Sequence, residues 1–325
     1  MIRSCIRALT LAVVAAAALV AAPGATFAQE KPVRIVFPFG AGGSGDALSR
    51  LVAEHLRTAL DQPVIVENRT GAQGRIGVKE VKAAAPDGNT LLLTPVAPMS
   101  VYQHVHKSLG YDPLADFTPV SQVAAFDFAV AVGPPAPVKT LKELVAWVKA
   151  NPDKGTYGSP GAGTLPHFLG VSFAKAAGID LRHLGYRGSA PAMVDLIGGQ
   201  IPIVFTTTSD ILEQHKAGRV KALATSAATR SPFLPQVPTL KEAGYDLVAT
   251  GWYGVFAPAG TPDAVVARLS AGIAAAVKTP KIKERLLAFG LVPTGTSAVE
   301  LGKIQKADSD LWAPAVEASG FTPKQ

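Results

Sequence analysis

The hydrophobic pattern of the chain alternates between short apolar runs and longer stretches with helical spacing. Between residues 33 and 96, three apolar runs (VRIVFPF, PVIVEN and TLLLTPV) are separated by segments in which apolar residues recur every three or four positions. Such runs are typical of buried strands, and the spacing between them is typical of amphipathic helices. The order strand–helix–strand–helix–strand predicts a mainly parallel sheet with helices on its faces.

The same alternation returns after an irregular stretch at 98–116 and two β-prone runs, FTPVSQVAAF and DFAVAVGP. The second run ends at Gly133-Pro134-Pro135, where we expect the chain to cross into a second lobe. ATGWYGVFAP at 249–258 is predicted to be a long strand that crosses back. We therefore expect an α/β fold with lobe 1 formed by residues 29–132 and 251–325, and lobe 2 by residues 133–250. Two crossing strands make a hinge, and the cleft between two lobes is a usual ligand site.

The first 28 residues differ from the rest of the chain. Arg3 and Arg7 precede an apolar run at 8–22, and Thr26-Phe27-Ala28 supplies small residues for cleavage. This pattern predicts a secretory signal peptide, residues 1–28, since the run is shorter than the roughly 20 residues of a spanning helix. The mature protein would then be periplasmic and, with Cys5 removed, without cysteine.

The charge of the chain is low and mildly positive. Charged residues make up 17% of the sequence, with a formal net charge of +7, and the basic residues form no long run. A nucleic-acid surface usually needs clustered basic residues, so we expect no nucleic-acid partner. A small positive excess favours anionic solutes only weakly.

A glycine-rich loop follows the first predicted strand. Gly40, Gly42 and Gly45 form a G-x-G-x-x-G pattern, with Asp46 at the start of the next helix. Free N–H groups and the positive dipole end of a helix N-terminus attract anions. The same spacing is a dinucleotide fingerprint, and Glu67 ends the next strand where a ribose-binding carboxylate is expected.

Several separate motifs resemble one known family, in the same order along the chain. They are PFGAGGSGDALSR (38–50), ENRTGAQGRIG with PDGNTLLL (67–93), YGSPGAGTLPHFLG (157–170), YRGSAPAMVDLIGGQI (186–201) and WYGVFAPAGTP (252–262). Together they resemble the Bug family, the periplasmic solute-binding proteins of tripartite tricarboxylate transporters. The resemblance covers essentially the whole mature chain.

This resemblance implies a two-lobed periplasmic binding protein of type II-like architecture that closes on a carboxylated solute. Each lobe is then a mainly parallel sheet flanked by helices. The ligand classes implied are acidic amino acids, di- or tricarboxylates and aromatic carboxylates. The partners implied are membrane transporter subunits or, for an orphan receptor, a sensor kinase. We expect a monomer with no cofactor, no metal and no catalytic residues.

The resemblance also implies which residues hold the ligand, in part through backbone N–H groups. The first jaw is Phe39, Ala41, Gly42, Ser44 and Asp46; the opposing jaw is Ser159, Gly161, Gly163, Thr164 and His167; further candidates are Arg187, Gly188, Ser189, Thr207 and Asp210.

Each of these side chains also has a structural interpretation. Phe39 is either a wall of the site or a core residue. Asp46 fits a helix N-cap better than an anion contact, although a ligand amine would suit it. His167 and Arg187 either bind a carboxylate or brace their loops. Thr207 and Asp210 either line the cleft or cap the helix that begins there.

Two other classes of protein remain open on the sequence. A Rossmann-type NAD-dependent oxidoreductase would use Gly40, Gly42, Gly45 and Glu67, but the signal peptide and the intervening Pro38 and Phe39 count against it. A secreted interaction protein would bind no small ligand. The prediction is therefore a non-enzymatic receptor whose ligand the sequence does not identify.

Overall fold

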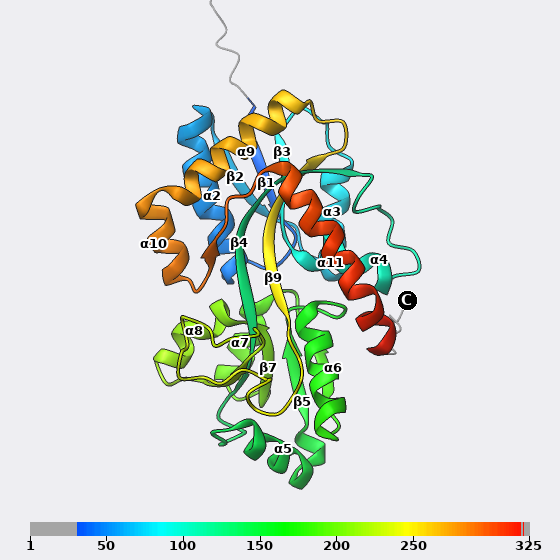
Figure 1. Cartoon of the computed structure of the whole chain (residues 1–325), viewed down its shortest axis with the longest axis vertical. Helices are drawn as coiled ribbons and strands as arrows, with labels where there is room; N and C mark the ends of the chain where they lie inside the picture. The colour runs from blue at the N-terminus through cyan, green and yellow to red at the C-terminus, as the bar shows by residue number, and fades with distance from the viewer. Residues whose placement is uncertain (1–30, 320, 322–325) are drawn as a thin grey trace, which may run out of the picture. The chain divides into compact units, whose positions relative to one another are not determined.

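The computed structural model describes residues 31–319 and 321 (Figure 1). The predicted signal peptide, residues 1–28, lies outside the described residues. Two groups of strands share one long strand, β4 (Phe117–Val132). From Pro32 onward the chain forms one unit, so both groups are described together.

The first group contains the three strands predicted from the N-terminal pattern. Strands β2 (Val64–Asn68), β1 (Val33–Phe37) and β3 (Thr90–Pro95) lie in that order and are parallel. Strand β9 (Thr250–Pro258) then runs antiparallel between β3 and β4, and β10 (Val292–Pro293) pairs with β4. The helices that accompany this first group of strands are α2 (Ser44–Leu60), α3 (Arg75–Lys82), α9 (Asp263–Lys278), α10 (Pro280–Ala288) and α11 (Ala298–Ser319).

The second group lies on the other part of β4. Strands β7 (Ile203–Thr207) and β8 (Lys221–Thr225) pair with β4 in antiparallel fashion, and β7, β5 (Thr156–Ser159) and β6 (Arg182–Gly185) are parallel neighbours. Helices α5 (Leu141–Ala150), α6 (Leu165–Ala177), α7 (Ser189–Ile197) and α8 (Thr208–Lys216) flank these strands. Figure 1 shows α6 and α8 on opposite sides of them.

The two β-prone runs after residue 116 form a single strand rather than two. β4 pairs with β9 from Phe117 to Asp127 and with β7 from Phe128 to Val132, so its partners change between neighbouring residues. The sequence FTPVSQVAAFDFAVAV has no turn signal. Its first half pairs with β9 and its second half with β7, so the strand continues without a break. The chain thus passes between the two groups of strands inside β4.

Two local predictions were wrong, and one short strand was not predicted. The stretch at 98–116 was expected to be irregular, but it contains a buried π-helical segment, η2 (Ala97–Val101), and a short helix, α4 (Tyr102–Val105). The amide of Gln305 in α11 holds this region by donating to the carbonyls of Met99 (3.1 Å) and Pro113 (2.9 Å). A short helix was expected within 235–246, where the chain instead forms turns and an isolated parallel bridge between Thr239 and Thr225. Strand β10 was not predicted.

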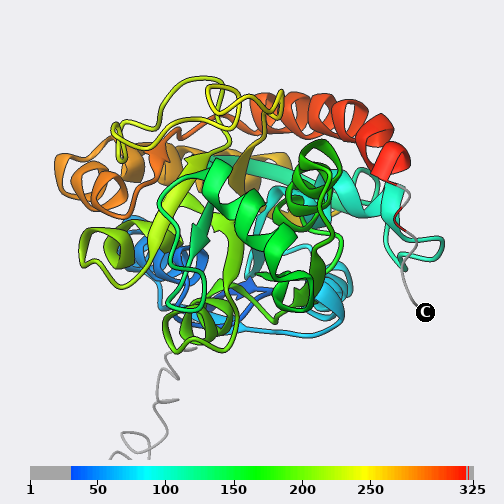
Figure 2. The same ribbon diagram turned by 90° about the horizontal axis from the view of Figure 1, so that it is seen from below.

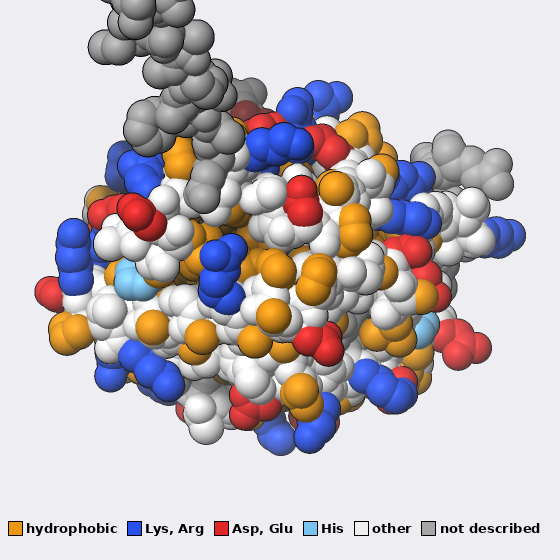
Figure 3. Space-filling model, turned by 90° about the horizontal axis from the view of Figure 1, so that it is seen from above, with side chains coloured by type: hydrophobic (Ala, Val, Ile, Leu, Met, Phe, Trp, Pro, Cys, Tyr) orange, Lys and Arg blue, Asp and Glu red, His pale blue; other side chains and the backbone are white. Residues whose placement is uncertain are grey.

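Helix α11 follows the first group of strands and reaches the short helix α4, as Figures 1 and 2 both show. There, the His104 Nε2 atom lies 2.9 Å from the Ser309 hydroxyl. On the face in Figure 3, basic and acidic side chains are interspersed rather than gathered into separate patches. This distribution agrees with the scattered charges of the sequence.

Candidate functional site

The loop after β1 is shaped by the carboxylate of Asp46. The N-cap of α2 is Gly43, so the prediction that Asp46 caps the helix was wrong. Asp46 lies in the first turn of the helix and accepts the Gly42 N–H at 3.0 Å, the Asn68 amide at 3.0 Å and the Arg50 guanidinium. Burial opposes its ionisation, but the Gly42, Arg50 and Asn68 contacts outweigh burial, and the pKa of Asp46 lies below its ordinary value. A charged side chain of the protein therefore holds this loop.

The loop before α6 is held by neutral groups instead. The N–H of Gly163 donates to the Nδ1 atom of His167 (3.1 Å), and the Thr164 hydroxyl donates to the Gly161 carbonyl (2.7 Å). The Ser159 hydroxyl lies 2.7 Å from the Nε2 atom of His183. Gly163 has φ +78°, a conformation that favours glycine.

Two buried histidines stack beneath this second loop. The ring centroids of His167 and His183 are 4.0 Å apart. Burial lowers the pKa of His167 to about 4, and burial together with the neighbouring His167 lowers that of His183 to about 3. Both rings are neutral near pH 7, and the Nδ1 atom of His167 serves as an acceptor. This geometry gives His167 a structural contact; its ring does not line the hollow described below.

The segment Arg187–Ser189 meets the first loop through its backbone. The N–H of Gly40 donates to the Arg187 carbonyl at 2.8 Å, and Gly188 adopts φ +127° at the N-cap of α7. The Arg187 side chain is exposed and borders a neighbouring groove with Thr70–Gly74. The loop after β1 and the segment Arg187–Ser189 are therefore in direct contact, which closes this side of the site.

Asp210 of α8 forms a second contact with the first loop. Its Oδ1 atom accepts the Ser44 N–H at 2.8 Å, and its Oδ2 atom accepts from the hydroxyls of Thr206 (3.2 Å) and Thr207 (2.7 Å). Thr207 is the N-cap of α8 and accepts the Asp210 N–H. The N-terminal end of α2, where N–H groups have no partner within the helix, is thus approached by a carboxylate of the protein itself.

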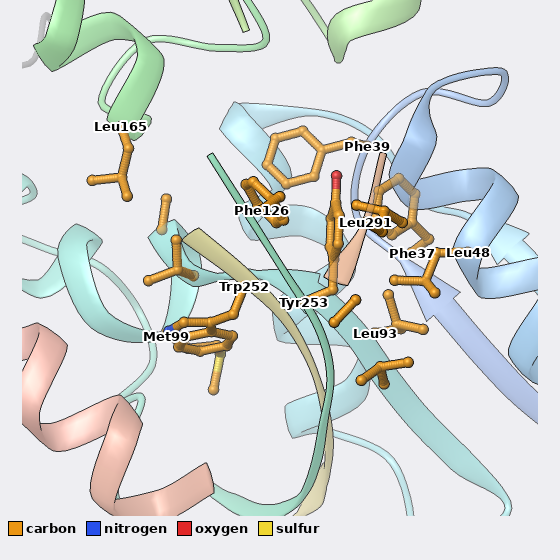
Figure 4. Packing of buried hydrophobic residues seen from close by; sticks show 14 of the residues in the cluster. Phe37, Phe39, Leu48, Leu93, Met99, Phe126, Leu165, Trp252, Tyr253 and Leu291 are labelled. Carbon is orange, nitrogen blue, oxygen red and sulfur yellow. The ribbon is translucent and has the colours of Figure 1, made fainter. Parts of the chain in front are cut away.

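These loops surround a hollow with mostly apolar walls. The space that water-sized groups can occupy inside it is about 50 Å³, and a single water needs roughly 10–15 Å³ by the same measure. Including the part that opens to solvent, the empty volume is about 550 Å³. Figure 4 shows Phe39, Phe126 and Tyr253 close together, with Leu165 approaching from α6. None of the described residues that line it is charged. The lining residues are Phe37, Phe39, Gly40, Gly43, Gly45, Pro95, Val96, Ala97, Phe126, Phe128, Pro160, Thr164, Leu165, Pro166, Gly188, Ser189, Thr207 and Tyr253.

The predicted site residues divide into two sets around this hollow. Phe39, Thr164, Gly188, Ser189 and Thr207 line it. The others belong to the same loops and helix starts but not to the lining: Ala41, Gly42, Ser44, Asp46, Ser159, Gly161, Gly163, His167, Arg187 and Asp210.

The aromatic walls are what the sequence interpretation missed. Phe126 and Phe128 stand two residues apart in β4 and both face the hollow, as alternating positions of a strand do. Tyr253 of β9 packs against Phe126 with ring centroids 4.6 Å apart. The alternation was visible in the sequence, but only the pairing of β4 with β9 brings these rings together.

The residue that a dinucleotide site would need is engaged elsewhere. Glu67 accepts from the Arg34 guanidinium at 2.8 and 3.0 Å and from Arg69 at 2.6 Å. The hydrogen bond from Arg34 is the main reason that the pKa of Glu67 falls to about 2. A carboxylate held in such pairs is not free to bind ribose hydroxyls.

Neither a membrane-spanning helix nor a metal-binding cluster occurs among the described residues. Within residues 31–319, no helix combines the length and the apolar character needed to cross a bilayer. Across the same part of the chain, His, Cys, Asp and Glu side chains nowhere gather in threes that could hold a metal ion.

An α/β fold whose loops from two groups of strands close around one hollow is that of a two-lobed solute-binding protein. The family model for tripartite tricarboxylate transporter family receptors matches residues 48–321. The chain therefore belongs to this receptor family.

Relatives and solved structures agree with this assignment. Protein BugT of Bordetella pertussis is 32% identical over 309 residues, covering 94% of this chain and 95% of that protein. The structure of the periplasmic binding protein BugD has a TM-score of 0.86 and 34% identity, covering 91% of this chain and 99% of BugD. Rpa4515 of R. palustris, solved with adipate, has a TM-score of 0.86 and 29% identity, covering 90% and 98%. The α/β, two-lobed fold predicted from the sequence is confirmed.

Proposed function

We propose that this chain is a non-enzymatic periplasmic receptor that binds a small carboxylate in the hollow and passes it to a membrane transporter or a sensor. The observation that carries the proposal is the convergence of the starts of α2, α6 and α7 on one hollow. N–H groups at helix starts bind carboxylates. The structure of Rpa4515 with adipate supports the proposal, because adipate is a small carboxylate.

The proposed movement is a change between open and closed lobes, with lobe 1 formed by residues 29–132 and 251–325 and lobe 2 by residues 133–250. The contacts Gly40–Arg187 and Ser44–Asp210 join the first loop to segments of lobe 2. A carboxylate that touches both sides would favour the closed form and shift the population toward it. We propose that the closed monomer presents the surface that the membrane partner contacts.

The test is calorimetric titration of the purified protein with mono-, di- and tricarboxylates, acidic amino acids and aromatic carboxylates. We expect saturable binding of at least one of them and a ligand-dependent rise in melting temperature. Titration with NADH serves as the control and should show no binding. Saturable NADH binding with hydride transfer would favour the oxidoreductase, and no response to any carboxylate would favour an interaction protein.

A further inference from the structure

We infer that the hollow selects a solute with a single carboxylate on an apolar body, and that Asp210 excludes a second carboxylate. This inference rests on the proposed receptor function, because it names the class of carboxylate that the same site takes.

The walls of the hollow supply an apolar surface but no counter-charge. The rings of Phe39, Phe126 and Tyr253 provide flat apolar contact, and the described lining residues include no Lys, Arg or His. Backbone N–H groups at the helix starts can satisfy one carboxylate. A second carboxylate would lose its hydration against aromatic walls without gaining a cation, which is costly.

Asp210 adds a specific reason why a second carboxylate is rejected. The start of α2 is where a second anionic group would find N–H donors, but Asp210 already accepts the Ser44 N–H there at 2.8 Å. Both carboxylate oxygens of Asp210 are engaged, since Thr206 and Thr207 donate to the other one. A ligand carboxylate at this end would face a like charge that the protein holds in place.

Asp210 influences specificity without lining the hollow itself. It does not line the hollow, whereas its neighbours Ser189 and Thr207 do. A Cβ atom built on Gly43 would lie 3.5 Å from the Asp210 Oδ1 atom and 2.8 Å from the Ser189 hydroxyl. The start of α2 therefore packs closely against Ser189 and in van der Waals range of Asp210, which places the Asp210 carboxylate directly behind this end of the hollow.

The experiment compares acids that share one body and differ in the number of carboxylates. Hexanoate is titrated against adipate, and benzoate against terephthalate, by calorimetry at pH 7. We expect the wild-type protein to bind the monoacid of a pair at least roughly tenfold more tightly, since an unpaired buried charge costs more than about 1.4 kcal/mol.

The variant Asp210→Asn keeps the shape and one acceptor oxygen but removes the charge. We expect the preference for the monoacid to shrink by severalfold, mainly through tighter binding of the diacid. The control is Asp246→Asn, which makes the same charge change at a carboxylate whose side chain is 89% exposed. It should leave the preference unchanged, and melting curves of both variants report whether they fold.

The outcomes separate this inference from the proposed function. If wild-type protein binds adipate or terephthalate as tightly as the monoacid, the inference is overturned while the receptor function stands. If Asp210→Asn folds and keeps the wild-type preference, Asp210 does not exclude the second carboxylate. If no carboxylate of any class binds, the receptor function itself fails.

Discussion

The two glycine-rich loops on either side of the hollow have similar sequences but are held by different chemistry. In the first loop, the N–H groups of Gly42 and Ser44 donate to the carboxylates of Asp46 and Asp210. In the second, the N–H of Gly163 donates to the neutral ring of His167. A repeated glycine pattern therefore specifies backbone shape, whereas the acceptor that fixes each loop depends on residues outside the pattern.

Low pH is expected to affect the two loops most differently, because it destabilises the second loop before the first. His167 has a pKa of about 4 in the folded protein, against an ordinary value of 6.5, so the unfolded chain binds a proton first as pH falls. Stability is therefore lost between about pH 6.5 and 4, on the order of 3 kcal/mol for this residue alone. Asp46, whose pKa is lowered below 3.8, stays charged and keeps its contacts through this range.

Urea unfolding at pH 7 and pH 4.5, with hydrogen exchange followed at residues 160–170 and 40–50, measures this difference. We expect protection to fall first at the second loop. Burial also lowers the pKa values of His183, His106 and His215, so wild type is compared with the variant His167→Gln, which removes the share of His167 together with its effect on the stacked His183. An equal pH dependence in wild type and variant would contradict the assignment.

A smaller effect is expected from removing one acceptor from each loop. Asp46→Ala should lower the free energy of unfolding by about 2 kcal/mol, because the donors of Gly42, Asn68 and Arg50 lose their charged acceptor. Thr164→Val removes a neutral hydrogen bond to Gly161 and should cost about 1 kcal/mol. Urea midpoints of both variants measure the difference; a larger loss in Thr164→Val would show that charge is not what distinguishes the loops.

The smallest effect concerns glycines at which the loops meet other segments. A Cβ atom on Gly40 would lie 2.8 Å from the Arg187 carbonyl oxygen, too close for the closed arrangement. Gly161 is the matched control, since a Cβ there would make ordinary contact at 3.4 Å with Thr164. We expect Gly40→Ala to weaken carboxylate binding roughly threefold, which is about 0.7 kcal/mol, and Gly161→Ala to change it little. Calorimetric titration measures both, and equal affinities would mean that the contact between Gly40 and Arg187 does not limit binding.

The sequence predicted the fold through local patterns that tertiary contacts reinforce. The alternation of strands and helices gave β1, β2, β3 and the helices between them because each buries an apolar face in sequence order. The π-helical segment η2 was missed because Gln305, far along the chain, fixes it. The N-cap of α2 was missed because Asp46 suits a cap by residue type, whereas its actual acceptor role depends on Asn68 and Arg50.

The candidate site was predictable in its loops but not in its walls. Glycine motifs mark where backbone must turn before a helix, and these segments do surround the hollow. Phe126 and Tyr253 come from strands whose pairing joins distant parts of the chain. The contact between Asp210 and Ser44 likewise depends on how the segments are brought together, so no local spacing could indicate it.

The single strand β4 also determines when the chain can finish folding. Phe117 pairs with Pro258, and Asp127 pairs with Thr250, so the centre of the first sheet joins segments separated by most of the second group of strands. Such distant pairing carries a large loop-closure cost and slows folding. A nascent chain thus cannot complete its central sheet until residue 258 is available, and until then β3 and the first half of β4 lack the strand that joins them.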